Sequence, residues 1–204
     1  MEYYQRHARA LAARYESIAF ETAHAGVLPW LPEAAGCVLD VGAGSGRDAG
    51  WFAAKGHAVF AVEPASAMRE QAAARHPSDR ICWIDDRLPE LAWVLEQPFT
   101  YEVVWCSAIW MHLAPVERPQ ALQRLLLRLL PGGRLFLSLR QGESGDGRTL
   151  YDVSVDEVQR LASAAGALSV AVIASEDALA RDGVSWQHVV LEAVHHGSGA
   201  GEPS

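Results

Sequence analysis

Short apolar runs alternate with stretches of helical periodicity along most of the chain. Runs rich in β-branched and aromatic residues predict five strands, at residues 37–41, 58–62, 81–84, 101–107 and 135–139. Stretches with apolar positions three and four residues apart predict helices between them, at residues 48–55, 65–75 and 116–130. Such alternation is typical of parallel strands joined by crossover helices. The pattern therefore predicts an α/β fold.

The beginning of the chain departs from this alternation. Residues 3–24 carry apolar and aromatic positions at helical spacing with arginines between them, which predicts an amphipathic helix ahead of the first strand. We interpret residues 1–34 as a helical lid, residues 35–194 as one domain, and the small, polar residues 195–204 as a flexible tail.

The last third of the domain has a different order of elements. Ser154, with Glu157 three residues later, matches a capping box and predicts a helix over 155–165. The last two predicted strands, 168–174 and 185–194, are separated by a loop that is short for a crossover helix. We therefore expect them to pair as an antiparallel hairpin.

Composition restricts the class of protein. The 204 residues are 50% apolar, enough for one domain with its own core. The formal net charge of -8 argues against broad attraction to nucleic acid or to anionic membranes. No apolar stretch is long enough for a membrane span, and Cys37, Cys82 and Cys106 lie singly in apolar runs, without metal-ligand spacing. We expect a cytoplasmic protein without metal, nucleic acid or membrane partners, and the oligomeric state stays open.

A glycine-rich turn follows the first predicted strand. Residues 38–48 read VLDVGAGSGRD, a strand that runs into three glycines and then a helix. Glycines let the backbone pass close under a ligand, and the helix start has unpaired amides. The dinucleotide fingerprint is G-x-G-x-x-G, but Arg47 stands where its third glycine would fall. This spacing argues against a pyrophosphate site.

Acidic residues follow the next two predicted strands. Glu63 ends the second strand, 21 residues after Gly42, where a carboxylate can accept both hydroxyls of a ribose. Asp85 and Asp86 end the third strand, where an acceptor can take an adenine amine. Because Asp also caps turns well, we expect one of this pair to bind and the other to cap. These positions meet at the carboxyl edge of an open sheet, where ligands bind.

At this point the chain resembles the class I S-adenosylmethionine-dependent methyltransferases, in their small, bacterial-type branch that acts on small molecules. The resemblance spans about residues 35–193. The resemblance rests on five motifs: VLDVGAGSG at 38–46, AVEP at 61–64, DDRLP at 85–89, SAIWMHL at 107–113 and LLPGGRLFLSL at 129–139. It implies a single Rossmann-like sheet of seven mostly parallel strands, with helices on both faces and the last strand antiparallel.

The resemblance also implies a cofactor, S-adenosylmethionine, with S-adenosylhomocysteine as product. Asp40 would order the glycine turn or meet the methionine ammonium through water, and Arg47 either reaches the methionine carboxylate or faces solvent. The Ser107 carbonyl would hold the cofactor's amino group. The implied cofactor-binding residues are Asp40, Gly42, Ala43, Gly44, Gly46, Arg47, Glu63, Asp85, Asp86 and Ser107.

The segment after the fourth strand lies nearest the methyl group in the resembled fold. His112 is its one titratable side chain, and an imidazole suits a general base. The alternative is a histidine that orients a backbone carbonyl and supports the start of the next helix. The substrate-binding candidates are Trp110 and Met111 as walls, Arg140 and Arg148 for an anionic group, and Tyr15 as a lid contact.

Three hypotheses about function remain open. The first is methyl transfer to the O, N or S atom of a small molecule. The second is a cofactor-binding module or a protein methyltransferase. The third is a nucleotide-dependent oxidoreductase, which the glycine spacing and the terminal hairpin disfavour. The Asn-Pro-Pro or Asp-Pro-Pro signature of nucleic-acid methyltransferases is absent after the fourth strand.

Overall fold

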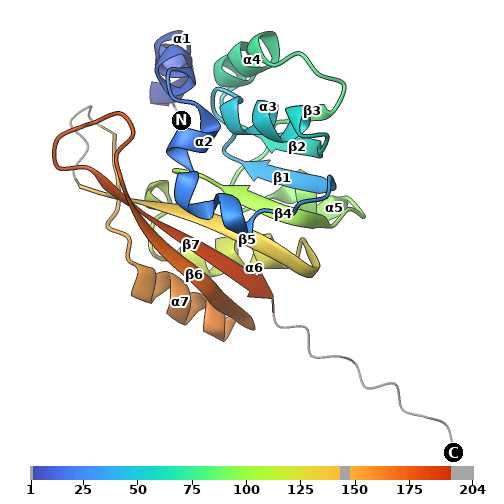
Figure 1. Cartoon of the computed structure of the whole chain (residues 1–204), viewed down its shortest axis with the longest axis vertical. Coiled ribbons are helices and arrows are strands. Elements are labelled where there is room, and N and C mark those ends of the chain that lie inside the picture. The colour runs from blue at the N-terminus through green and yellow to red at the C-terminus, as the bar shows by residue number, and fades with distance from the viewer. Residues whose placement is uncertain (1, 143–147, 194–204) are drawn as a thin grey trace, which may run out of the picture.

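The computed structural model describes residues 2–142 and 148–193, and the predicted tail at 195–204 lies outside them. Within these residues seven strands form one sheet in the order β3-β2-β1-β4-β5-β7-β6 (Figure 1). The strands are β1 (Cys37–Val41), β2 (Ala58–Val62), β3 (Ile81–Ile84), β4 (Tyr101–Cys106), β5 (Leu129–Gln141), β6 (Ala167–Glu176) and β7 (Ser185–Ala193).

The strand directions confirm the predicted topology. Strands β1 to β5 pair in parallel, whereas β7 is antiparallel to both of its neighbours, β5 and β6. The terminal hairpin is therefore formed as expected, and the last strand is the antiparallel one. The α/β, Rossmann-like fold with a seven-stranded, mostly parallel sheet is confirmed.

Helices cover both faces of the sheet. They are α1 (Glu2–Glu16), α2 (Phe20–Ala23), η1 (Ala25–Trp30), α3 (Arg47–Ala54), α4 (Ser66–Arg75), α5 (Ala92–Glu96), η2 (Trp110–His112), α6 (Arg118–Leu126) and α7 (Val155–Ala164). Neighbouring residues of a strand point to opposite faces. Accordingly, Val104 of β4 packs in the core beneath α5, α6 and α7, and Val103 packs in the core beneath α2, η1 and α3.

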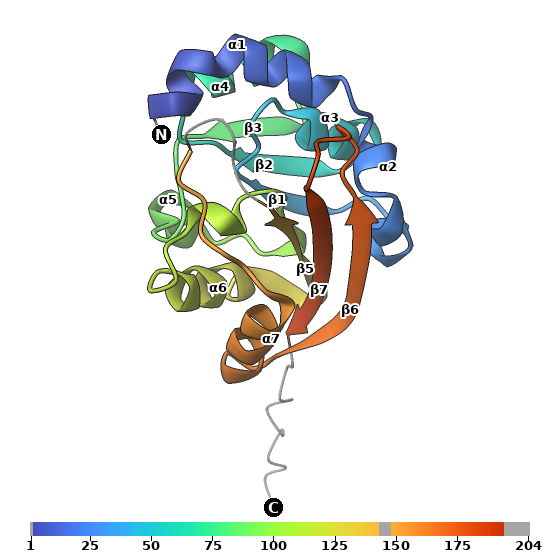
Figure 2. The same cartoon turned by 90° about the vertical axis from the view of Figure 1, so that its left-hand side faces the viewer.

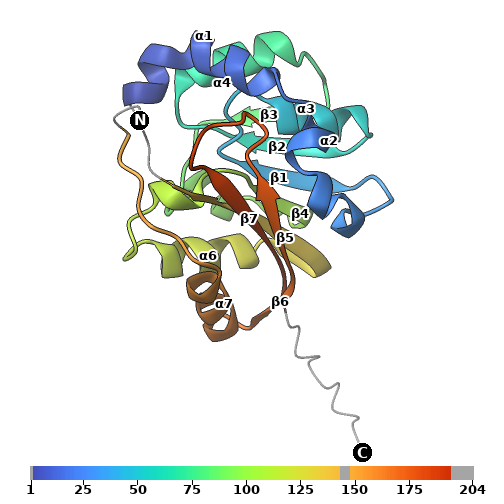
Figure 3. The ribbon, with the colours of Figure 1, turned by 60° about the vertical axis from the view of Figure 1, so that its left-hand side comes forward.

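The predicted helix over 3–24 is wrong as a single helix. Helix α1 ends at Glu16, where the Ser17 hydroxyl donates to the Arg14 carbonyl, and α2 begins at Phe20 after an extended residue. The break lets Phe20 turn into the core, where its ring stacks on Trp51 with centroids 4.0 Å apart. Helix α1 instead lies along α4, across the carboxyl edge of the sheet (Figures 2 and 3).

The prediction for residues 116–139 is also corrected. Helix α6 ends at Leu126, and β5 begins at Leu129, before the Pro-Gly-Gly sequence that was expected to end the helix. Leu129 pairs with Tyr101 of β4, and the register then shifts before Val103 pairs with Arg134. The residues between Leu129 and Arg134 thus form a bulge within β5, because the strand pairs with β4 both before and after them.

Of the capping box predicted for the helix at 155–165, the N-cap half is confirmed. The Ser154 hydroxyl accepts a hydrogen bond of 3.1 Å from the Glu157 amide at the start of α7. The Glu157 carboxylate instead pairs with the buried Arg118 of α6 at 2.5 Å. Among the described residues, no helix has the length and apolar character to cross a bilayer.

Candidate active site

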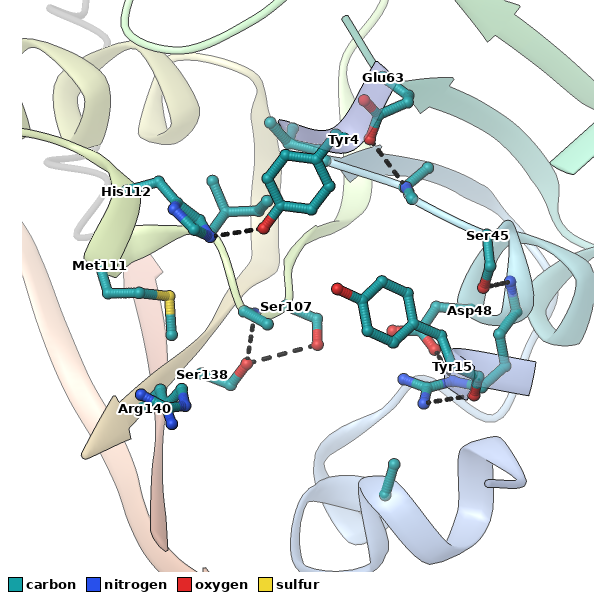
Figure 4. A pocket seen from close by; sticks show the side chains of 18 of the residues that line it. Tyr4, Tyr15, Ser45, Asp48, Glu63, Ser107, Met111, His112, Ser138 and Arg140 are labelled. Carbon is teal, nitrogen blue, oxygen red and sulfur yellow. Dashed lines mark hydrogen bonds and ion pairs between the residues drawn. The ribbon is translucent and has the colours of Figure 1, made fainter. Parts of the chain in front are cut away.

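The carboxyl ends of the central strands open onto a cavity of about 700 Å³ (Figure 4). The ends of β1, β2 and β4 form its floor, α1 covers it, and β5 and β7 form the opposite wall. Open α/β sheets bind ligands in this place, where the strand order reverses. The cavity lies between β1 and β4, the first pair of neighbours that are not consecutive in the chain.

The glycine turn is folded against the end of β2. The amides of Gly42 and Ala43 donate to the Val62 carbonyl at 2.7 and 2.9 Å. Gly42 has φ +77°, and a Cβ there would lie 2.2 Å from the Ile109 side chain. Any other residue would therefore clash with the loop that follows β4. Of the predicted cofactor-binding residues in this turn, Gly42, Ala43 and Gly44 line the cavity. Gly46 does not line it and is the N-cap of α3.

Glu63 ties this turn to the start of α4. Its carboxylate accepts from the Gly44 amide at 3.0 Å and from the Ala65 amide at 2.8 Å. Burial raises the pKa of Glu63 despite these hydrogen bonds. Each carboxylate oxygen has further acceptor capacity, and the side chain lines the cavity. A ligand with paired hydroxyls would therefore meet a prearranged acceptor here.

Asp40 lies beneath the turn and is fully enclosed. Burial, and secondarily the charge of Asp48, raises the pKa of its carboxyl well above the usual range. Its Oδ2 atom has no hydrogen-bond partner among the described residues. A buried polar atom without a partner is costly, and Asp40 lines the cavity, so this oxygen fits a cationic or hydrogen-bond-donating ligand group.

Arg47 and Asp48 form an ionic cluster beside the turn. Arg47 Nε donates to Asp48 Oδ1 at 2.6 Å, and the other oxygen accepts from Trp105 Nε1 at 2.9 Å and contacts His24 Nε2 at 3.1 Å. Burial opposes ionisation of Asp48, but His24 and Arg47 hold its pKa well below the usual range. Arg47 is 20% exposed and lines the cavity rather than facing open solvent. Contact with a methionine carboxylate stays a prediction.

The two aspartates after β3 have separate positions. Asp86 is buried, lines the cavity, and accepts hydrogen bonds from the amides of Arg87, Ala92 and Val94. It therefore fixes the turn that leads into α5. Asp85 points away from the cavity, with a side chain that is 69% exposed and an ion pair to Arg69 at 2.8 Å. Of the pair, the structure brings Asp86 alone to the cavity.

This difference predicts unequal effects of two substitutions on the stability of the fold. Asp86→Ala leaves buried amides without an acceptor and is expected to lower the free energy of unfolding by roughly 1–3 kcal/mol. Asp85→Ala removes an exposed ion pair, which typically contributes about 0–1 kcal/mol, and is expected to change little. Thermal unfolding of both variants measures the effect. Equal losses in the two would contradict the assignment of Asp86 as the structural cap.

The loop after β4 brings two of its predicted residues to the cavity. Met111 and His112 line it, whereas Trp110 is fully buried in the core under α6 and was wrongly expected to form a cavity wall. The reason is that 110–112 form a 3₁₀ turn, in which three successive side chains point in three directions. Nearby, the Ala108 amide donates to Ser138 Oγ at 2.8 Å, and that hydroxyl donates to Ser107 Oγ at 3.4 Å.

The opposite wall comes from β5 and β7. Arg140 of β5 lines the cavity two residues after Ser138, and Trp186 and His188 of β7 do the same. Burial lowers the pKa of His188 to about 4, so this imidazole is neutral at pH 7. Its Nε2 lies 3.0 Å from Ser175 Oγ. This wall therefore combines an arginine with a neutral imidazole and an indole.

Helix α1 contributes more to the cavity than was predicted. Tyr15 lines the cavity as expected, but Tyr4 lies deeper and contacts His112, with its hydroxyl 2.9 Å from Nε2 (Figure 4). Arg148 also lines the cavity, and its Nη1 donates to the same hydroxyl at 2.8 Å. Tyr4, His24, Asp48, Ser138, Trp186 and His188 are cavity residues that the sequence analysis missed.

A sequence signal existed for one of these residues, Ser138. Side chains two apart on a strand share a face, so placing Arg140 at the cavity also places Ser138 there. The same alternation joins Trp186 to His188, but nothing in the sequence indicated which face of β7 meets the cavity. Tyr4 reaches the site through the packing of α1 on α4, and His24 follows α2, after a break in the helix that the helical pattern did not predict.

Comparison with known proteins relates this site to one family. Residues 38–133 match the family described as a methyltransferase domain. The biotin biosynthesis bifunctional protein BioHC of Cellvibrio japonicus (strain Ueda107) is 31% identical over 134 residues, which cover 62% of this chain. The match covers 25% of BioHC, so the chain spans about a quarter of the length of this relative.

Solved structures agree in fold. A putative S-adenosylmethionine-dependent methyltransferase from Listeria monocytogenes has a TM-score of 0.71 at 16% identity, covering 85% of this chain and 99% of that one. The 1,6-didemethyltoxoflavin-N1-methyltransferase of Burkholderia thailandensis, bound to its substrate and S-adenosylhomocysteine, has a TM-score of 0.63 at 22% identity, covering 93% and 90%. The methyltransferase domain matched over residues 38–133, the similarity to BioHC and the shared fold together support a class I S-adenosylmethionine-dependent methyltransferase.

Proposed function

We propose that the protein transfers a methyl group from S-adenosylmethionine to a small molecule. The observation that carries this proposal is one covered cavity in which the glycine turn, Asp40 and Glu63 lie at one end and His112 at the other. Its volume of about 700 Å³ falls in the range of small-molecule sites. The Burkholderia relative acts on a small heterocycle, and other structural neighbours are glycopeptide and porphyrin methyltransferases.

The residues at the floor fit the cofactor. Glu63 would accept from the ribose hydroxyls, and Asp40 Oδ2, which has no hydrogen-bond partner in the described part of the chain, would receive the methionine ammonium or a water bound to it. Gly42, Ala43 and Gly44 line the cavity where the methionine moiety would lie, and a side chain at Gly42 would clash with Ile109 beside it. Asp86 lies where the adenine edge would be expected, and Ser107 and Arg47 lie at the methionine end.

The other end of the cavity would hold the acceptor. Arg140 and Arg148 line it with positive charge, and guanidinium groups bind carboxylate or phosphate through paired hydrogen bonds. We therefore propose an acceptor with an anionic group. Met111 and Trp186 add apolar surface that excludes water from the reacting atoms.

The bound cofactor supplies a methyl group on a positively charged sulfur, which an acceptor atom takes by in-line displacement. The protein's part is to align the acceptor and receive its proton. Holding two reactants in line removes a large share of such a barrier. His112 lies at the acceptor end of the cavity and would act as the general base when the acceptor is a hydroxyl or amine.

A turnover screen tests this function. The protein is incubated with methyl-labelled S-adenosylmethionine and pairs of small acceptors that share a nucleophile, one carrying a carboxylate and the other the matching amide. We expect label transfer and S-adenosylhomocysteine release, with the carboxylate preferred in each pair. Equal rates within the pairs would overturn the anionic acceptor. Tight binding of S-adenosylhomocysteine without turnover on any acceptor would instead indicate a binding module, and transfer to protein substrates alone a protein methyltransferase.

A further inference from the structure

A chain of hydrogen bonds joins Arg148, Tyr4 and His112 across the acceptor end of the cavity. Arg148 Nη1 lies 2.8 Å from the Tyr4 hydroxyl, which lies 2.9 Å from His112 Nε2. A guanidinium can only donate, so the phenol oxygen accepts from Arg148. The phenol keeps its single proton, which it can donate to His112 Nε2 when that nitrogen carries no hydrogen.

The protonation of Tyr4 supports this donation. Burial, followed by the neighbouring Tyr15, raises the pKa of Tyr4 to about 12, so the phenol keeps its proton at neutral pH. A phenol proton donated to Nε2 makes that nitrogen the acceptor, which places the proton of a neutral His112 on Nδ1. In this tautomer the lone pair of Nε2, which a general base uses, faces the Tyr4 hydroxyl.

The phenol oxygen also has capacity for one more donor. It has two lone pairs, of which one accepts from Arg148. Tyr4 lines the cavity, and its ring lies between Glu63 and His112 (Figure 4). A hydroxyl or amine of an acceptor can therefore donate to Tyr4 while Tyr4 donates to His112.

Two further contacts hold the Tyr4 ring in place. The ring meets the His112 ring edge to face, with centroids 5.7 Å apart. Helix α1 is fastened to the start of α4 by Gln5, whose side chain donates to Ser66 Oγ at 2.8 Å and accepts from the Ala67 amide at 3.3 Å. The relative position of the phenol and the imidazole is thus set by packing on two separate elements.

We infer that Tyr4 is a catalytic residue that relays the acceptor's proton to His112, an inference that rests on the proposed methyl transfer. As the acceptor atom bonds to the methyl carbon, its proton passes to Tyr4 Oη and the phenol proton passes to His112 Nε2. Tyr4 ends neutral, and His112 carries the positive charge until it releases a proton to solvent. Arg148 stabilises charge that develops on the phenol oxygen during the exchange.

Tyr4→Phe tests the relay because it removes one hydroxyl and keeps the ring over the cavity. We expect kcat to fall by roughly 10²-fold, the lower range for a positioned proton carrier, with the affinity for S-adenosylhomocysteine unchanged. Tyr3→Phe is the matched control, since Tyr3 precedes it on the same helix and also lies under Arg148. We expect this control to keep wild-type kcat.

A double substitution separates the relay from a purely structural lid. If Tyr4 and His112 act in one relay, His112→Asn combined with Tyr4→Phe should lower kcat little more than His112→Asn alone. A Tyr4→Phe enzyme with wild-type kcat and a raised KM would overturn the relay and leave Tyr4 as a lid contact. Methyl transfer itself would stand in that case, whereas a wild-type protein inactive on every acceptor would contradict the proposed function.

Discussion

Replacing His112 with asparagine is expected to lower turnover by roughly 10²- to 10⁴-fold, the usual contribution of a positioned proton acceptor. Asparagine keeps a polar side chain of similar size at the cavity but cannot take a proton. The loss should appear in kcat, because His112 lies at the acceptor end and the cofactor floor is built from other residues. Steady-state kinetics with the acceptor found by the screen measures it.

The stability of the same variant distinguishes catalysis from support of the loop. We expect the melting temperature and the affinity for S-adenosylhomocysteine to stay near wild type. His7→Asn serves as the control, because His7 lies on the exposed side of α1 and contacts the Tyr3 carbonyl. A stable His112→Asn protein with full activity would end the general-base hypothesis. A destabilised protein whose folded fraction keeps its activity would assign His112 to the loop.

Glu63→Ala is expected to weaken S-adenosylhomocysteine binding by about 10- to 150-fold. This range corresponds to the roughly 1.5–3 kcal/mol of hydrogen bonds to a charged group. The structure adds a second effect, since alanine also leaves the Gly44 and Ala65 amides without their acceptor. Glu63→Gln separates the two effects, because its amide oxygen still accepts one hydrogen bond while the charge is lost.

Calorimetric titration of both variants measures this effect. We expect Glu63→Gln to lose most of the affinity that Glu63→Ala loses, while Glu70→Gln, on the exposed side of α4, keeps wild-type affinity. Wild-type affinity in Glu63→Gln would remove the carboxylate from ligand contact. Its role would then be to hold the glycine turn against α4.

The sequence predicted the sheet well because its main signal is local. Each parallel strand is an apolar run and each crossover helix has its own periodicity, so the succession of elements and the parallel direction of the first strands could be predicted without knowledge of contacts. The errors occurred where pairing between distant segments decides the outcome. Leu129 joins the sheet because Tyr101 of β4 pairs with it, and no local pattern carries that information.

The site divides in the same way. The glycine turn, Glu63 and Asp86 follow strand ends, so their meeting at one edge could be predicted from parallel topology. Tyr4 and His112 are 108 residues apart, and their contact depends on how α1 packs on α4. Trp110 was misplaced because the direction of a side chain in a 3₁₀ turn depends on how the chain leaves β4.

Titration of the wild-type protein with S-adenosylhomocysteine and, separately, with NADH tests most directly that the cavity is an S-adenosylmethionine site. The glycine spacing, the Glu63 carboxylate and the Asp40 oxygen, which no group within residues 2–142 and 148–193 meets, fit an adenosyl amino acid. The turn also departs from the dinucleotide fingerprint, because Arg47 stands where the third glycine of that fingerprint would fall. We predict saturable binding of S-adenosylhomocysteine and none of NADH. Preferential binding of NADH would contradict the account.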